Sequence, residues 1–388
     1  MVWFIKDGGM TQYNYSCPED KILIENAINA LLKVVFGSAN KDTIKEVKED
    51  LSLQIRSINV YPQGTINEFV TERIDGCMMR NDDYYIDVYM RGYKGALPKD
   101  FEHIKEVASH ELCHVLSFIL PYSSVMQVGD VYYDVYQGTV QTTVYSKVGP
   151  IRNSYGLMFN ETMMDTIATL AVKNFDTSLA DVFTNDVFKK RHGVFMDKDG
   201  RSGYTGFTSL TRLAIAAFSN AGRLNYGELV NDGKGIFSLR HTMKDGTELF
   251  ANDFLYGILF NPLHIKTQFD KYMGEGKYIE FCRFIDAWYY SILNKTKPLT
   301  LETLRSIITR YTKYLTEFLD KKLADYSKRG YIDSGEFIRI KKNFYAISSD
   351  VKDEYIKSYE SEAFHLNSAN PNNVNLLNVW GVTDDWRE

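Results

Sequence analysis

A long amphipathic helix between two prolines, Pro98 and Pro121, is the most restrictive feature of the sequence. Proline is tolerated in the first turn of a helix but ends a helix when it occurs further along, so the pair predicts a helix over residues 98–120. Its apolar side chains recur every three or four positions and form one stripe, which consists of Ile104, Val107, Ala108, Leu112, Val115 and Ile119. Any fold of this chain must bury that stripe.

The first half of the chain combines helical and alternating hydrophobic patterns, whereas the second half is nearly all helical. In the first half we expect a helix over residues 18–36, strands over 51–61 and 84–90, a hairpin over 131–148 that turns near Gln137 and Gly138, and a helix over 160–172. In the second half we expect helices over residues 210–221, 248–260, 277–293, 301–326 and 334–345. The sequence therefore predicts an α+β fold with an α/β subdomain over residues 1–180, a mostly α-helical subdomain over 181–360 and a tail over 361–388.

Composition excludes several classes of protein. The chain has 388 residues, 44% of them hydrophobic, which is enough for a sizeable core and excludes a disordered chain. Its formal net charge of −5 provides no positive field for phosphate backbones, so we expect no nucleic-acid partner. The apolar runs are shorter than the roughly 20 residues that a bilayer requires, so we expect no membrane span.

The four cysteines are isolated from one another, and none forms a C-x-x-C pair. This spacing indicates neither a disulfide framework nor a thiolate zinc site. The N-terminal residues MVWFIKDGGM do not resemble a signal peptide, so a cytoplasmic location is the default expectation. Secretion without a leader, or after a leader has been removed, is left open.

The predicted helix over residues 98–120 contains the sequence HELCH, with His110 and His114 one turn apart. Residues at i and i+4 lie on one helix face with Cβ atoms about 5–6 Å apart, so both imidazoles reach one metal ion. Glu111 follows the first histidine and can exchange protons with a water on that ion. With 7 histidines in 388 residues, the pattern is expected by chance in roughly 1% of such chains. Both histidines also lie off the apolar stripe, and we therefore interpret them as metal ligands.

A catalytic zinc site uses three protein ligands and leaves one position open for water. The sequence NETMMD offers Glu161 as the third ligand, at the start of the predicted helix over residues 160–172. Asp165 follows one turn later on the same face, where it can accept a hydrogen bond from the free N–H group of a ligating histidine. On its own an E-x-x-x-D pair is common on solvated helices, but HELCH makes the metal interpretation the better one.

Together HELCH and NETMMD resemble the two motifs of the gluzincin metallopeptidases, the thermolysin-like group. The similarity spans roughly residues 84–175, under a quarter of the chain. It implies a zincin-like α/β subdomain in which His110, His114 and Glu161 bind Zn2+, Glu111 is the general base and Asp165 orients a histidine, most plausibly His110. The spacing between the motifs is longer than in thermolysin. No third histidine follows at the metzincin spacing, and no G-x-M-E-N segment of the aminopeptidases is present, which favours endopeptidase activity.

The resemblance also suggests roles for residues outside the two motifs. The strand over residues 84–90 precedes the HELCH helix, where zincins place the edge strand that binds an extended peptide or protein substrate. Tyr155 lies where related enzymes carry a tyrosine that stabilises the oxyanion, and Tyr145 is the reserve candidate. Three later histidines are also candidates for assisting the oxyanion, and the sequence does not rank them: His192, His241 and His264.

Two other functions remain open at this point. The first is a binding protein that retains the zincin scaffold but cleaves nothing; the presence of Glu111 argues against it, because a structural site needs no base. The second is a zinc hydrolase that acts on a non-peptide amide bond. Substrate preference and oligomeric state leave no recognisable motif.

Overall fold

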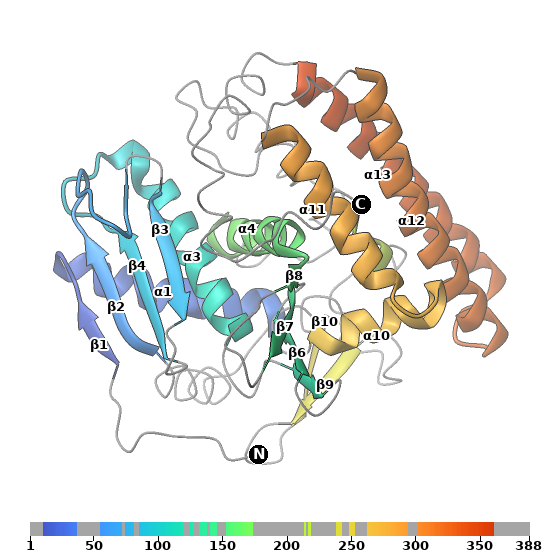
Figure 1. Cartoon of the computed structure of the whole chain (residues 1–388), viewed down its shortest axis with the longest axis horizontal. Helices are drawn as coiled ribbons and strands as arrows, with labels where there is room; N and C mark the ends of the chain where they lie inside the picture. Colours follow the sequence, from blue (N-terminus) through green and yellow to red (C-terminus); the bar gives the residue numbers. More distant parts are fainter. Residues whose placement is uncertain are drawn as a thin grey trace. The chain divides into compact units, whose positions relative to one another are not determined.

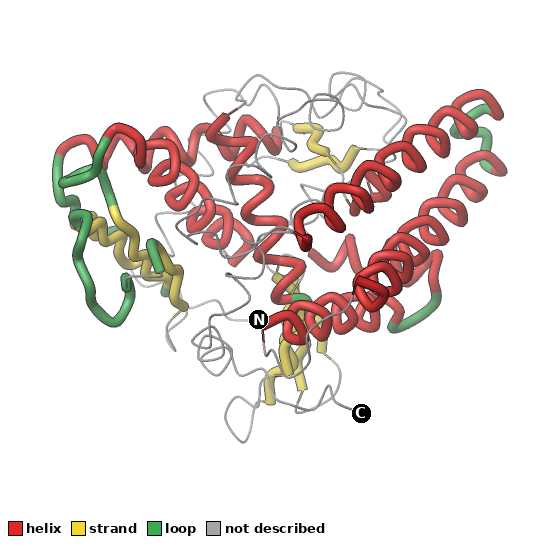
Figure 2. Tube along the Cα trace, turned by 90° about the horizontal axis from the view of Figure 1, so that it is seen from above, coloured by secondary structure: helices red, strands yellow, loops and turns green. Residues whose placement is uncertain are grey.

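The computed structural model describes residues 11–36, 55–71, 74–80, 85–118, 124–127, 132–137, 140–145, 153–173, 213–214, 216–218, 238–242, 248–252, 262–293 and 301–360 (Figure 1). These residues form a mixed α and β structure in which helices dominate, as the red segments of Figure 2 show. The chain divides into two compact units, one made of Met1–Ser123, Met164–Asp176 and Arg240–Ala251, and the other of Ser124–Met163, Thr177–Leu239 and Asn252–Glu388. The three-part division at residues 180 and 360 was drawn from hydrophobic pattern alone and stays a prediction.

The first unit contains a four-stranded sheet with the order β1-β2-β4-β3 (Figure 1). Its strands are β1 (Gln12–Asn14), β2 (Ile55–Tyr61), β4 (Ile86–Arg91) and β3 (Gly76–Arg80). β1, β2 and β4 are parallel, whereas β3 is antiparallel to β4. Buried side chains such as Ile58, Val88 and Met90 form the core of the sheet. The predictions of strands over residues 51–61 and 84–90 are confirmed where the structure describes them.

The edge position predicted for the strand over residues 84–90 is wrong. β4 pairs with β2 on one side and with β3 on the other, so both of its backbone edges are hydrogen-bonded. Among the described residues, the outer strands are β1 and β3, and β3 pairs only with β4. Alternation identifies the two faces of a strand but contains no information about its neighbours within the sheet, and the short β3 sequence GCMMR does not alternate clearly.

Two helices pack in the same unit. Helix α1 (Pro18–Phe36) has the predicted bounds, and α3 (Phe101–Phe118) follows a short 3₁₀ turn, η1 (Pro98–Asp100), that begins at the predicted proline. Helix α3 contacts α1, β3 and β4. The predicted apolar stripe faces the core, with Ile104, Ala108 and Leu112 at most 3% exposed.

The second unit contains a four-stranded antiparallel sheet with the order β5-β6-β7-β8. Its strands are β5 (Ser124–Gln127), β6 (Tyr132–Gln137), β7 (Val140–Tyr145) and β8 (Asn153–Tyr155). β6 and β7 pair from Gln137 and Val140 outward, which confirms the predicted hairpin. Strands β5 and β8 were not predicted, because each is too short to show a period.

Helices make up most of the second unit in the described part of the chain. These are α10 (Pro262–Met273), α11 (Lys277–Leu293), α12 (Leu301–Lys328) and α13 (Ser334–Glu360). The predictions over residues 277–293 and 301–326 are confirmed, whereas the helix predicted over 334–345 starts as predicted but continues to Glu360. The rings of Phe218, Phe269 and Phe318 pack together in the core with centroids 4.7–5.9 Å apart. Residues 213–214 and 216–218 are helical, in agreement with the predicted helix over 210–221. No helix among the described residues is long and apolar enough to cross a bilayer.

The helix predicted over residues 248–260 is wrong at its start. β10 (Glu248–Asn252) is a strand that pairs with β9 (Ser238–Thr242), and residues 253–260 lie outside the described residues. A short apolar run is compatible with the period of a helix and with that of a strand. Pairing with β9, and not the run itself, therefore determines that these residues form a strand. The predicted tail over residues 361–388 also lies outside the described residues.

The carboxylate of Asp20 connects the start of α1 to the end of β4. Its Oδ2 atom accepts hydrogen bonds from the backbone N–H of Ser16 and of Cys17 and from the Ser16 hydroxyl, at 2.6–3.0 Å. Its Oδ1 atom accepts the backbone N–H of Tyr93 at 2.9 Å. Asp20 is fully buried, and a Cβ atom on neighbouring Gly92 would lie only 2.2 Å from its Oδ1 atom. A buried charge with this many donors is costly to remove.

We expect Asp20→Ala to lower the free energy of unfolding by about 3 kcal/mol, because three backbone N–H groups lose their acceptor. Urea unfolding followed by circular dichroism measures the loss. Glu19→Ala is the matched control, since Glu19 is exposed in the same helical turn and should cost less than about 0.5 kcal/mol. Equal midpoints for the two variants would contradict the structural role of Asp20.

Candidate metal centre

Helix α3 presents His110, Glu111 and His114 from a largely buried segment. The side chain of His110 is 14% exposed, and Glu111 and His114 are each 7% exposed. The next residues along the helix, Leu112, Cys113 and Val115, are almost completely buried. These polar side chains therefore have few hydrogen bonds to water available to them. Buried polar groups of this kind require protein or metal partners instead.

Helix α4 (Leu157–Lys173) supplies Glu161 from its first turns. The helix starts directly after Gly156, whose positive φ of 84° favours glycine, and the Gly156 carbonyl accepts the backbone N–H of Asn160 at 2.9 Å. Apolar side chains around α4, including Phe159, Met163 and Met164, are at most 2% exposed. Glu161 itself is 9% exposed, so water has little access to it.

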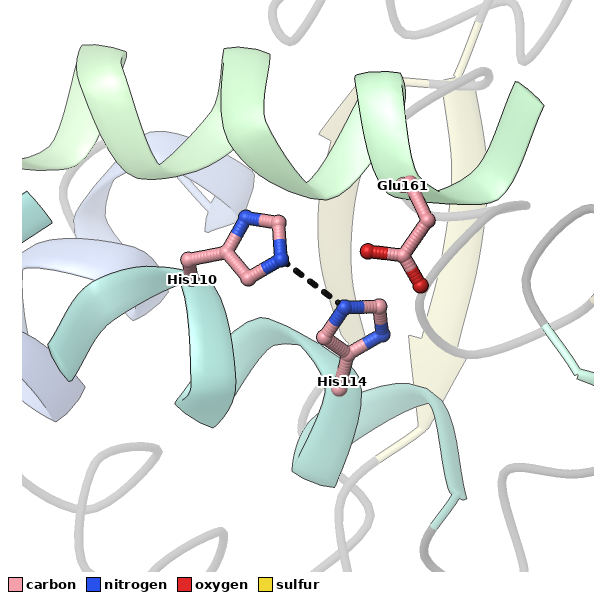
Figure 3. A group of neighbouring side chains, drawn as sticks. All are labelled: His110, His114 and Glu161. Atoms are coloured by element: carbon pink, nitrogen blue, oxygen red, sulfur yellow. Dashed lines mark hydrogen bonds between the residues drawn. The ribbon is translucent and has the colours of Figure 1, made fainter. Parts of the chain in front are cut away.

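Three potential ligands converge at this place. The Nε2 atoms of His110 and His114 lie 3.0 Å apart, and Figure 3 shows the two imidazoles on α3 facing the carboxylate of Glu161 on α4. One ligand atom from each of the three residues lies within 4.8 Å of the other two. Among the described residues, this is the only group of three or more His, Cys, Asp or Glu side chains with such a geometry.

These separations fit a single metal ion. Zinc bonds of about 2.0–2.1 Å in a tetrahedron place two ligand atoms about 3.3 Å apart, close to the 3.0 Å between the imidazole nitrogens. The ligand atoms lie within 4.8 Å of one another, and rotation of the side chains would have to shorten the larger separations for an ion to bind. Two histidines and one glutamate form a ligand set that catalytic zinc uses, with a fourth position left for water. The identity of the ion as Zn2+ stays a prediction.

Asp165 lies on the opposite side of the His110 ring from the ligand nitrogen. Its Oδ1 atom is 3.9 Å from His110 Nδ1, and both side chains are about equally buried. This distance is too long for a hydrogen bond. The carboxylate nevertheless lies nearest to Nδ1, which is the ring nitrogen that keeps its proton when Nε2 binds a metal. Asp165 therefore lies at ion-pair distance from the predicted histidine, and its role in orienting that ring stays a prediction.

The side chain of Glu111 lies against strand β3. A Cβ atom added to Gly76 would lie 2.8 Å from Val107 Cγ1, 3.0 Å from Glu111 Cγ and 3.2 Å from Glu111 Oε1. Real Cβ atoms do not approach side chains this closely, so only glycine allows β3 to pass here. Gly76 thus defines one wall beside the Glu111 carboxylate.

A second contact connects the residue before β3, Asp75, to the helix. His103, on α3, lies with its Nε2 atom 3.0 Å from Asp75 Oδ2, and Arg91 donates to Asp75 Oδ1 at 2.6 Å. Burial raises the pKa of the Asp75 carboxyl, but the hydrogen bond and charge of His103 and the charge of Arg91 outweigh it, so the pKa is lowered. His103 thus has its own carboxylate partner and is not part of the three-ligand group.

Two cysteines close to the site are protonated. Burial, followed by the charge of Glu111, raises the pKa of Cys77 to about 12. Burial also raises the pKa of Cys113 well above its usual value, with smaller contributions from Asp165 and Glu111. Neither cysteine belongs to the group of side chains whose ligand atoms lie within 4.8 Å of one another. Cys113 is fully buried.

The remaining predicted residues occupy places whose side chains the structure does not describe. Tyr155 ends β8, directly before Gly156 and helix α4, and Tyr145 ends β7. His241 lies on β9 and His264 on α10, while His192 lies outside the described residues. The oxyanion role of Tyr155 therefore stays a prediction.

Sequence reasoning missed two residues that support the site, Gly76 and Asp286. Asp286 on α11 accepts the backbone N–H of Gly156 at 2.7 Å, immediately before α4. A glycine within a strand is a signal of close backbone approach, and an aspartate on the apolar face of a predicted helix is a signal of a buried partner. Neither signal identifies the residue that Gly76 or Asp286 contacts.

The chain matches no family model, no curated protein and no solved structure. The resemblance to gluzincins therefore depends on the two motifs, and what supports it structurally is the geometry of the three ligands.

We expect the chain to bind one zinc ion, and His110→Ala, His114→Ala and Glu161→Ala each to weaken binding at least about 100-fold, because each removes one of three ligands. Equilibrium dialysis with metal quantification by mass spectrometry measures the change. His103→Ala is the matched control and should retain wild-type binding, since His103 faces Asp75. Binding that survives all three substitutions would place the metal elsewhere.

Proposed function

We propose that this protein is a zinc-dependent metallopeptidase of the gluzincin type that acts as an endopeptidase. The observation that supports this most is the convergence of His110, His114 and Glu161, with Glu111 next to the first ligand on the same helix. A structural metal site normally uses four protein ligands, whereas this group has three. A zincin-like fold for the first unit is part of the same proposal.

Each residue then has a defined role. His110, His114 and Glu161 would hold the zinc ion, which would supply Lewis-acid chemistry for a carbonyl and lower the pKa of a bound water to about 7. Glu111 accepts the proton of the attacking water and transfers it to the departing amine. Asp165, after a shift of about 1 Å, accepts a hydrogen bond from His110 Nδ1 and fixes the ring. Tyr155 donates a hydrogen bond to the oxyanion.

The proposed substrate is a peptide in an extended conformation. β3 passes the Glu111 side chain at Gly76, and among the described residues it pairs only with β4. An extended chain added to such an outer strand forms backbone hydrogen bonds that do not depend on its sequence. This arrangement would align a peptide bond with the base.

Two alternatives differ from this proposal in measurable ways. A non-catalytic binding protein on the same scaffold would bind zinc but cleave nothing in a pool of denatured proteins. A hydrolase for a non-peptide amide would leave that pool intact but cleave amide bonds of other classes. Glu111, buried beside the ligands, favours catalysis over binding alone.

We expect Glu111→Gln to reduce peptide hydrolysis by at least about 100-fold while zinc remains bound, because glutamine has the same shape but accepts no proton. Mass spectrometry of a peptide pool, with and without chelator, measures cleavage. Glu102→Gln, at an exposed position of the same helix, is the control and should behave as wild type. Wild-type turnover by Glu111→Gln would refute the role of the base.

Gly76→Ala should reduce turnover by about tenfold or more and leave the zinc content unchanged. The added methyl group displaces Val107 and Glu111, whereas the ligand histidines are not among the closest atoms to Gly76. Steady-state kinetics and metal analysis of the same samples separate the two effects. Gly335→Ala, in helix α13, is the control, because its nearest neighbour is a side-chain oxygen at 3.2 Å on the exposed Asp333. Unchanged turnover in Gly76→Ala would show that this contact does not position Glu111.

A further inference from the structure

The first turn of α4 is held by helix α11 through two contacts. The backbone N–H of Gly156 donates to Asp286 Oδ2 at 2.7 Å, and the ring of Phe159 meets the ring of Phe281 edge-on at 5.6 Å. Asp286 and Phe281 both belong to α11, and Gly156 and Phe159 flank the start of α4. One contact is polar and the other apolar, and together they restrict both the position and the rotation of the helix start.

The polar contact is buried and well placed. Asp286 is 8% exposed, and Gly156 is buried, so water does not compete strongly for either group. Hydrogen bonds to a carboxylate are roughly twice as strong as those between neutral groups. The carboxylate also lies at the N-terminal end of α4, where the helix dipole favours a negative charge. Because the Gly156 carbonyl accepts the N–H of Asn160, both polar groups of Gly156 are engaged.

The position of this first turn determines the position of Glu161. A side-chain carboxylate lies about 6 Å from the helix axis, so a rotation of about 10° displaces it by about 1 Å. That displacement is half of a zinc–ligand bond, and a ligand site tolerates only about 0.5 Å. A contact that prevents such rotation therefore changes metal affinity without touching the metal.

We infer that Asp286 is a positioning residue of the metal centre, which acts through the start of α4 on the carboxylate of Glu161. The inference rests on the proposed function, because it requires Glu161 to be a zinc ligand. Asp286 is far from the two motifs in the sequence, and it extends the site to a helix that contains no ligand.

The test compares the zinc affinities of variants by competition with a chromophoric chelator. Asp286→Ala should bind zinc about tenfold more weakly than wild type, while Asp286→Asn should stay within about threefold, because the amide oxygen still accepts the N–H of Gly156. Asp286→Leu replaces the alanine variant if that variant does not fold. Asp333→Ala is the matched control, since Asp333 accepts the backbone N–H of Glu336 at the start of α13 and should leave zinc affinity unchanged.

A double-mutant cycle distinguishes positioning from general destabilisation. If Asp286 acts through Glu161, then Glu161→Ala and the double variant Glu161→Ala/Asp286→Ala should bind zinc equally weakly. A further tenfold loss in the double variant, or wild-type affinity in Asp286→Ala, overturns the inference while zinc binding by the wild-type chain stands. Failure of the wild-type chain to bind zinc overturns the proposed function and the inference together.

Discussion

Two imidazole nitrogens that face each other at 3.0 Å in a largely buried environment are the constraint on which the candidate site depends. Two lone pairs at this distance repel, so a proton or a cation must lie between them. The nearby carboxylate of Glu161 adds negative charge at the same place and favours a cation. Helix α3 produces this arrangement through its own geometry, because His110 and His114 are one turn apart.

Specific contacts also hold the two helices that carry the candidate ligands. On one side, β3 lies so close to α3 that only a glycine fits beside Val107 and Glu111. His103 on the same helix also contacts Asp75, the residue directly before β3. Helix α4 is held at its start by a buried aspartate and an aromatic contact from α11. In both cases backbone geometry is controlled by contacts that are distant in sequence.

Elements with a long and regular hydrophobic pattern were predictable. The helices over residues 18–36 and 277–293 have the bounds that the sequence indicates, and the hairpin turns where expected. The strand Glu248–Asn252 was mistaken for a helix, and β4 was mistaken for an edge strand, because both depend on which strand pairs with them. The local hydrophobic pattern indicates which face of a helix or strand is buried. It does not indicate which strands lie beside it in a sheet.

The sequence alone determined the pairing of the two histidines and the position of Glu111 beside them, since these follow from the spacing within one helix. Only the tertiary structure decided that Glu161 meets those histidines, that β3 instead of β4 passes Glu111, and that Asp286 holds the start of α4. The physical reason is the sequence separation of the residues that interact. Helix geometry is set by bonds between residues four apart, whereas the approach of two helices or strands is set by the packing of side chains from the whole chain.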